Sequence, residues 1–67
     1  MLSARNQFPG TVRSIKLGGI MAEVVVAVGD LQFVSAITRT SAEDLKLQPG
    51  DTVTVVVKST EVMVAKG

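Results

Sequence analysis

Residues 21–28 would be apolar on both faces if the chain were extended there, because Glu23 is their only charged residue. Successive side chains of a strand point to opposite faces of its sheet. The interior of a small barrel can bury only one of these two faces, so the other needs a separate cover. A second copy of the chain is the simplest cover, and the sequence therefore predicts an oligomer.

The remainder of the chain is also typical of β-structure. Valine occurs twelve times, whereas Phe8 and Phe33 are the only aromatic residues. Val, Ile, Thr and Ala dominate segments of strand length, and turn signals such as Gly18-Gly19 and Gly29-Asp30 separate them. Pro9-Gly10 should interrupt the chain before the first strand. We expect five strands, at about residues 11–17, 21–28, 32–38, 52–57 and 61–65.

A short helix is expected between the third and fourth strands. Thr40 followed by Glu43 matches the capping box that opens many helices, which predicts a helix over about 41–45. The turn Gln48-Pro49-Gly50-Asp51 should then lead into the fourth strand. Three strands, a helix and two strands is the element order of the five-stranded oligonucleotide/oligosaccharide-binding (OB) barrel. The predicted fold is therefore an all-β OB-type barrel, with residues 1–67 in a single domain.

Composition narrows the classes of protein to which this chain could belong. With 67 residues and neither Cys nor His, it has no disulfides and none of the usual zinc ligands, which again favours oligomerisation. No apolar run is long enough to cross a bilayer, and no secretory signal is apparent. The net charge of +1 lacks the basic excess of a nucleic-acid binder. We expect a cytoplasmic protein that binds neither membranes nor metal cations.

Two clusters near the chain ends each combine a cation with a hydroxyl group. Ser3 and Arg5 form the first cluster, and Lys58 and Ser59 form the second. Together they would offer two positive charges and several donors, which suits a small tetrahedral dianion. Each residue taken alone is more typical of an exposed surface or loop. The oxyanion-site hypothesis therefore depends on whether the clusters meet.

A second source of hydroxyl groups lies at the predicted helix start, where Thr38 and Ser41 stand three residues apart. Their simplest role is helix capping, and anion binding is the alternative. A site made only of donors would leave the proton of hydrogen phosphate without an acceptor. Fully deprotonated dianions such as molybdate, tungstate or sulfate leave no group unpaired. Separating molybdate from sulfate would depend on the size of the cavity.

Four segments of the chain carry a resemblance to a known family. They are Ser3-Ala4-Arg5-Asn6-Gln7, Gly10-Thr11-Val12, Ala22-Glu23-Val24-Val25 and the closing stretch Val55-Val56-Val57-Lys58-Ser59-Thr60-Glu61-Val62-Met63-Val64. With these segments, the chain resembles the molbindins, the Mop-domain proteins, over nearly its whole length. The resemblance implies an OB-type barrel in a homo-hexamer built as a trimer of dimers. It also implies that molybdate or tungstate is held between subunits, without an organic cofactor, for storage.

The resemblance further implies roles for individual residues. By matching positions, Ser3 and Arg5 would contact the oxyanion, Lys58 and Ser59 would complete the pocket, and Thr38 and Ser41 match a further hydroxyl pair of the family. The family also has a second kind of oxyanion site. For that site we expect backbone amides around Gly19, Ile20 and Met21.

Three other functions compete with oxyanion storage. A regulatory oxyanion-sensing module would have to act with a transporter or transcription factor, because the chain contains no ATPase or DNA-binding segment of its own. A single-stranded nucleic-acid binder of the OB class would need stacking aromatics, and this chain has two phenylalanines only. An enzyme is the least favoured of the three, because we find no arrangement of general base and nucleophile.

Overall fold

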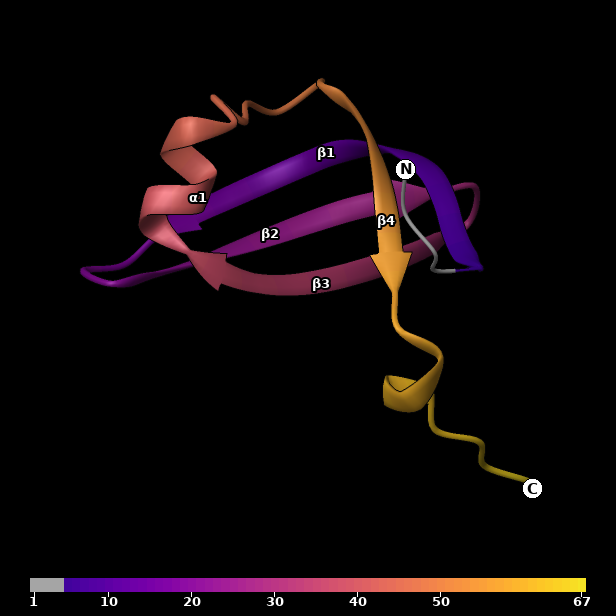
Figure 1. Ribbon diagram of the computed structural model, residues 1–67. Coiled ribbons are helices and arrows are strands. Elements are labelled where there is room, and N and C mark those ends of the chain that lie inside the picture. Colours follow the sequence, from indigo (N-terminus) through magenta and orange to yellow (C-terminus); the bar gives the residue numbers. More distant parts are fainter. Residues whose placement is uncertain (1–4) are drawn as a thin grey trace.

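The computed structural model describes residues 5–67, which form one antiparallel sheet with a short helix at one end (Figure 1). The strands are β1 (Asn6–Leu17), β2 (Met21–Val28), β3 (Leu31–Thr38) and β4 (Thr52–Val57), and the helix is α1 (Arg39–Asp44). A 3-10 turn follows at Ser59–Glu61. The strand order is β3-β2-β1-β4. The predicted all-β class is confirmed, with the helix between the third and fourth strands as expected.

The first strand is longer than the sequence predicts, because Pro9 and Gly10 lie inside β1 rather than before it. The first half of β1 pairs with β4, from Asn6 opposite Val57 to Thr11 opposite Thr52. The second half pairs with β2. Since β1 pairs only with β4 around Pro9, a residue without an N–H group can be accommodated there. The predicted chain break is therefore wrong.

The hydrophobic core lies on one face of the sheet, where β2 contributes its even-numbered residues. Val12, Val24 and Val26 are each at most 4% exposed, and partly buried Leu47 and Val53 pack against them. On the other face of β2, Met21 is 47% exposed. The two-faced character of this strand is thus visible in the structure, and what covers the second face stays a prediction.

Turn chemistry fixes how consecutive elements are joined. Gly29 has φ 57° in the two-residue hairpin between β2 and β3, as its place in the sequence predicts. Before β4, the amide of Asp51 donates to the carbonyl of Gln48 at 3.1 Å, and Gly50 has φ 95°. Pro49 followed by a glycine with positive φ matches a type II turn.

Helix α1 begins two residues earlier than predicted. Its N-cap is Thr38, whose side chain accepts a hydrogen bond from the amide of Ser41. Thr40 therefore lies inside the helix, and Glu43 pairs with Arg39 instead of completing a capping box. Either Thr38 or Thr40 could cap a helix on the basis of residue type alone. Thr38 pairs with Met21 at the end of β3, so the strand ends there and the helix begins at the next residue.

The predicted fifth strand, 61–65, is not a strand in the described part of the chain. After the 3-10 turn, residues 62–67 have no regular structure, and Met63 and Val64 are 93% and 90% exposed. Figure 1 shows this tail leaving the sheet beyond the end of β4. A strand needs a hydrogen-bonded neighbour, and the tail has none within residues 5–67. The described sheet is therefore four-stranded, and β3 and β4 do not close it into a barrel.

Candidate functional site

The register of β1 and β4 places two of the predicted cations just beyond the same end of this strand pair. Asn6 is paired with Val57, so Arg5 and Lys58 are the residues that come next in the chain beyond the last pair of the two strands. Both are exposed, as is Ser59 at the start of the 3-10 turn. The predicted ligand Ser3 lies outside the described residues. Arg5 and Lys58 thus adjoin the same end of the β1–β4 pair, and whether the two clusters form one site stays a prediction.

The positive charges of Arg5 and Lys58 determine which ligands this end of the sheet would attract. Two like charges at neighbouring strand ends repel each other, and a dianion between them would relieve that repulsion. The backbone of Lys58 also stabilises the 3-10 turn, because its carbonyl accepts a hydrogen bond from the amide of Glu61 at 2.9 Å. The turn therefore fixes where Ser59 stands relative to Lys58. The arrangement can hold a small anion by charge-assisted hydrogen bonds.

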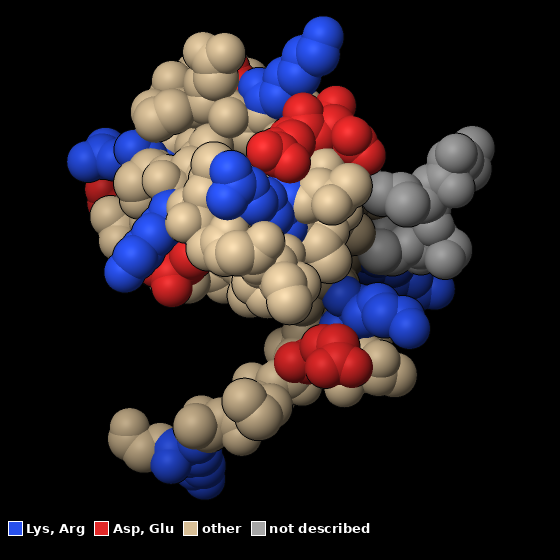
Figure 2. Space-filling model, turned by 90° about the vertical axis from the view of Figure 1, so that its left-hand side faces the viewer, with Lys and Arg blue, Asp and Glu red and all other residues tan. Residues whose placement is uncertain are grey.

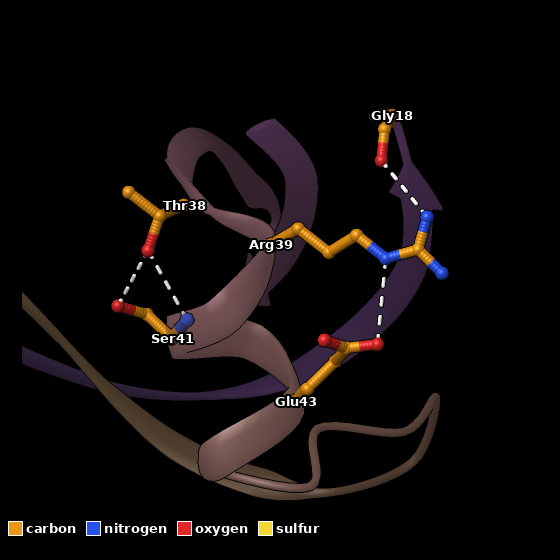
Figure 3. Close-up of polar contacts among 5 residues, drawn as sticks. All are labelled: Gly18, Thr38, Arg39, Ser41 and Glu43. Atoms are coloured by element: carbon orange, nitrogen blue, oxygen red, sulfur yellow. Dashed lines mark hydrogen bonds and ion pairs between the residues drawn. The ribbon is translucent and has the colours of Figure 1, made fainter. Parts of the chain in front are cut away.

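The predicted hydroxyl pair lies at the other end of the sheet, where β3 meets α1 (Figure 3). The Thr38 hydroxyl donates to the Ser41 hydroxyl oxygen at 2.8 Å, and the Ser41 amide donates to the Thr38 hydroxyl oxygen at 3.1 Å. Both residues are exposed. The capping role is therefore confirmed for Thr38, whereas Ser41 lies within α1 and supplies the amide that Thr38 caps. The hydroxyls are accessible from solvent as well, so capping does not prevent anion binding.

The predicted second site is next to this hydroxyl pair. Met21 pairs with Thr38 across β2 and β3, and the carbonyl of Ile20 accepts a hydrogen bond from the amide of Arg39 at 2.7 Å. Gly18, Gly19 and Ile20 form the turn between β1 and β2, and all three are exposed. The backbone around Gly19 and the hydroxyls of Thr38 and Ser41 thus share one end of the molecule.

Arg39 lies between these groups, and the sequence interpretation did not select it. Its guanidinium donates through Nη1 to the carbonyl of Gly18 at 3.1 Å and through Nε to Glu43 Oε2 at 3.3 Å (Figure 3). The spacing of four residues between Arg39 and Glu43 could have indicated the ion pair. The hydrogen bond to Gly18 joins residues 21 positions apart, so no local sequence pattern could have predicted it.

One chain does not bring the two groups of predicted residues together. Arg5 and Lys58 stand where β1 begins and β4 ends, whereas Thr38 and Ser41 stand where β3 meets α1, at the opposite end of the sheet in Figure 1. On the face that carries α1, Figure 2 shows basic and acidic side chains interspersed rather than gathered by sign. Anion attraction would therefore arise from local pairs of groups rather than from a broad field.

Other features of the described residues do not match an oxyanion site. Beside α1, a hollow of about 270 Å³ is lined mainly by apolar side chains, among them Ile15, Leu17 and Leu47. None of the predicted site residues lines it. Across residues 5–67, no group of three or more acidic, His or Cys side chains could hold a metal ion. No helix in that range is long and apolar enough to cross a membrane.

Comparison with known proteins gives a consistent set of similarities. The profile of the TOBE domain matches residues 2–64. Molybdenum-pterin-binding protein 3 of Clostridium pasteurianum is 44% identical over 64 residues, which are 94% of each chain. The molybdenum transport protein ModE of Azotobacter vinelandii is 42% identical over 62 residues, covering 91% of this chain but 23% of ModE.

Solved structures agree with the sequence relatives. A molybdate-binding protein from Sporomusa ovata has a TM-score of 0.95 and 44% identity, with 98% of both chains covered. The cytoplasmic molybdate-binding protein ModG, solved with molybdate bound, has a TM-score of 0.83 and 37% identity. That match covers 88% of this chain and 43% of ModG.

Proposed function

The chain belongs to the TOBE domain family, and from that premise we propose that it binds molybdate reversibly and catalyses no reaction. The observation that carries the proposal is its end-to-end similarity to the molybdate-binding protein of Sporomusa ovata. The relatives also confirm the resemblance to the molbindins that the terminal segments indicate. The proposed role is storage of molybdate, or of tungstate, in the cytoplasm, without an organic cofactor.

The proposed site is built first on Arg5 and Lys58. Their positions next to the paired residues Asn6 and Val57, where β1 begins and β4 ends, support it, because two cations neutralise the charge of a dianion. Ser59, and Ser3 from the segment before the described residues, would donate hydroxyl hydrogen bonds. A proton-free oxyanion matches such donors better than hydrogen phosphate, whose O–H would need an acceptor.

Thr38 and Ser41 enter the proposed site from another copy of the chain. Their distance from Arg5 and Lys58 within one chain supports this arrangement, since only a neighbouring copy could bring both ends together. The homo-oligomer that we propose is a hexamer, a trimer of dimers. Its second kind of site would use the backbone around Gly19, Ile20 and Met21.

Calorimetric titration with molybdate tests this function directly. Arg5→Ala and Lys58→Ala should each weaken binding about tenfold or more, since each removes a charge-assisted hydrogen bond. Arg13→Ala and Lys66→Ala remove the same charges from exposed positions outside the site and serve as matched controls. Native mass spectrometry of each variant shows whether the oligomer still forms. Unchanged affinity in both site variants would exclude this assignment of ligands.

A regulatory role is the second candidate, and the similarity to ModE favours it. In that case the chain would sense molybdate for a transport system instead of storing it. Cells without the chain distinguish the two roles. Storage predicts a faster fall in total cell molybdenum after molybdate is withdrawn, whereas regulation predicts a changed uptake rate. An oligonucleotide mobility-shift assay at low salt tests the single-stranded nucleic-acid alternative, for which we expect no shift.

A further inference from the structure

Arg39 fastens the β1–β2 turn to the start of α1 at two points. Its backbone amide donates to the carbonyl of Ile20 at 2.7 Å, and its Nη1 donates to the carbonyl of Gly18 at 3.1 Å. These two carbonyls lie on either side of Gly19. The ion pair with Glu43, at 3.3 Å, holds the guanidinium in the orientation that this second bond requires. One residue therefore ties the turn to the start of α1 on both sides of Gly19.

The β1–β2 turn depends on contacts from outside itself for its order. It contains two glycines, which lose more conformational freedom on ordering than any other residue. Apart from its neighbours in the chain, no residue comes within 4 Å of where a Cβ of Gly19 would stand, so nothing packs against that side of the glycine. Inside the turn, the amide of Gly18 donates to the carbonyl of Met21 at 2.7 Å. Arg39 adds the tether from outside the turn.

The same residue adjoins the hydroxyl pair. Thr38 immediately precedes Arg39 and pairs with Met21, while Ser41 follows two positions later. A change in the position of the turn relative to α1 would therefore displace donors of both proposed kinds of site, the backbone amides of the turn and these hydroxyls. Ligand-binding donors contribute most when they are ordered before the ligand arrives, because ordering them on binding costs affinity.

We propose that Arg39 is a positioning residue for oxyanion binding at this end of the sheet. It holds the Gly18–Ile20 turn and the Thr38–Ser41 pair in one arrangement before the anion binds. The proposal rests on the proposed function and extends it to a residue outside the predicted ligands. The guanidinium acts through the Gly18 carbonyl and touches no anion itself.

The test combines hydrogen exchange in anion-free protein with molybdate titration of the full-length chain. In Arg39→Ala, the Gly18 amide should exchange faster than in the wild type before any anion is added, and molybdate affinity should fall about three- to tenfold. Arg39→Lys keeps a donor for the Gly18 carbonyl and should recover part of both losses. Glu43→Gln keeps the guanidinium but weakens its orientation, so its effect should be smaller. Arg13→Ala is the matched control, with wild-type behaviour expected.

Several outcomes would overturn the proposal. Wild-type affinity in a folded Arg39→Ala variant would do so, and so would weaker binding with unchanged Gly18 exchange, which would make Arg39 a direct ligand. If Arg39→Ala does not fold, Arg39→Lys and Glu43→Gln decide, since the proposal requires both to shift exchange and affinity in the same direction. If the folded wild type gives no heat with molybdate, the proposed function fails as well. Normal wild-type binding with unaffected variants would remove only the role of Arg39.

Discussion

At the scale of single residues, Gly10 lies in β1 close against the end of β2. A Cβ at this position would lie 2.5 Å from the carbonyl oxygen of Ala27 and 2.8 Å from a methyl carbon of Val28. Because a backbone oxygen cannot turn away like a flexible side chain, Gly10→Ala should destabilise the fold by about 1–3 kcal/mol. Gly19→Ala, where the added Cβ would meet open space, should stay within about 0.5 kcal/mol of wild type. Urea denaturation of both variants measures the difference, and equal losses would contradict the argument.

Lys46 shows the opposite situation, a side chain where glycine would fit better. Its φ of 53° is left-handed, and it follows the C-cap of α1. The amides of Lys46 and Leu47 donate to the carbonyls of Glu43 and Ala42, at 3.0 and 3.2 Å, which is the Schellman pattern. Lys46→Gly should therefore raise the free energy of unfolding by about 1 kcal/mol. Lys46→Ala removes the same charge but keeps the strained backbone, so thermal unfolding should show no gain for it.

At the scale of elements, the start of α1 is set by Thr38. Its hydroxyl oxygen accepts the hydrogen bond from Ser41, and Thr38→Ala should cost about 1 kcal/mol. Thr40 lies within the helix and is exposed, so Thr40→Ala should leave the stability nearly unchanged. Chemical denaturation of the anion-free protein compares the two variants. A larger loss in Thr40→Ala would favour the helix start predicted from the sequence.

The sequence predicts elements well where local patterns decide them. The strands 21–28 and 52–57 and the Gly29-Asp30 hairpin are confirmed, because apolar runs and turn residues carry their signal locally. The start of β1 could not be predicted in this way. Pro9 and Gly10 read as a break until it is known that β1 changes its partner from β4 to β2 around Thr11. The tail at 61–65 has strand composition, but the sequence does not show which edge would pair with it.

At the scale of the whole molecule, the candidate site also has one part that the local sequence predicts and another that depends on long-range pairing. Residue chemistry alone selects Arg5 and Lys58 as anion partners, and the β1–β4 register then places both beyond the same end of the strand pair. Spacing along the chain could not show this, because the register depends on the long-range pairing of β1 with β4. Nor could it show that Thr38 and Ser41 lie at the other end of the sheet. This separation makes the proposed site depend on how copies of the chain assemble.

An experiment with mixed subunits tests this dependence. Lys58→Ala removes a cation from one end of each copy, and the double variant Thr38→Ala/Ser41→Ala removes hydroxyls from the other end. Each homo-oligomer should bind molybdate weakly, because every site lacks ligands from one of its two halves. When the two variants are refolded together in equal amounts, random assembly should restore roughly a quarter of the sites, those that take each half from an intact end.

Calorimetry on the mixture measures the number of strong sites, and native mass spectrometry confirms that mixed oligomers have formed. The two variants combined without subunit exchange are the control and should show no strong sites. If mixed oligomers form and no strong site returns, the two ends do not share a site between copies. Full molybdate affinity in the Thr38→Ala/Ser41→Ala homo-oligomer would lead to a different conclusion, since Arg5 and Lys58 would then hold the anion without a contribution from α1. Because each result identifies a different set of ligands, the mixture can show whether the cation pair or the assembly completes the site.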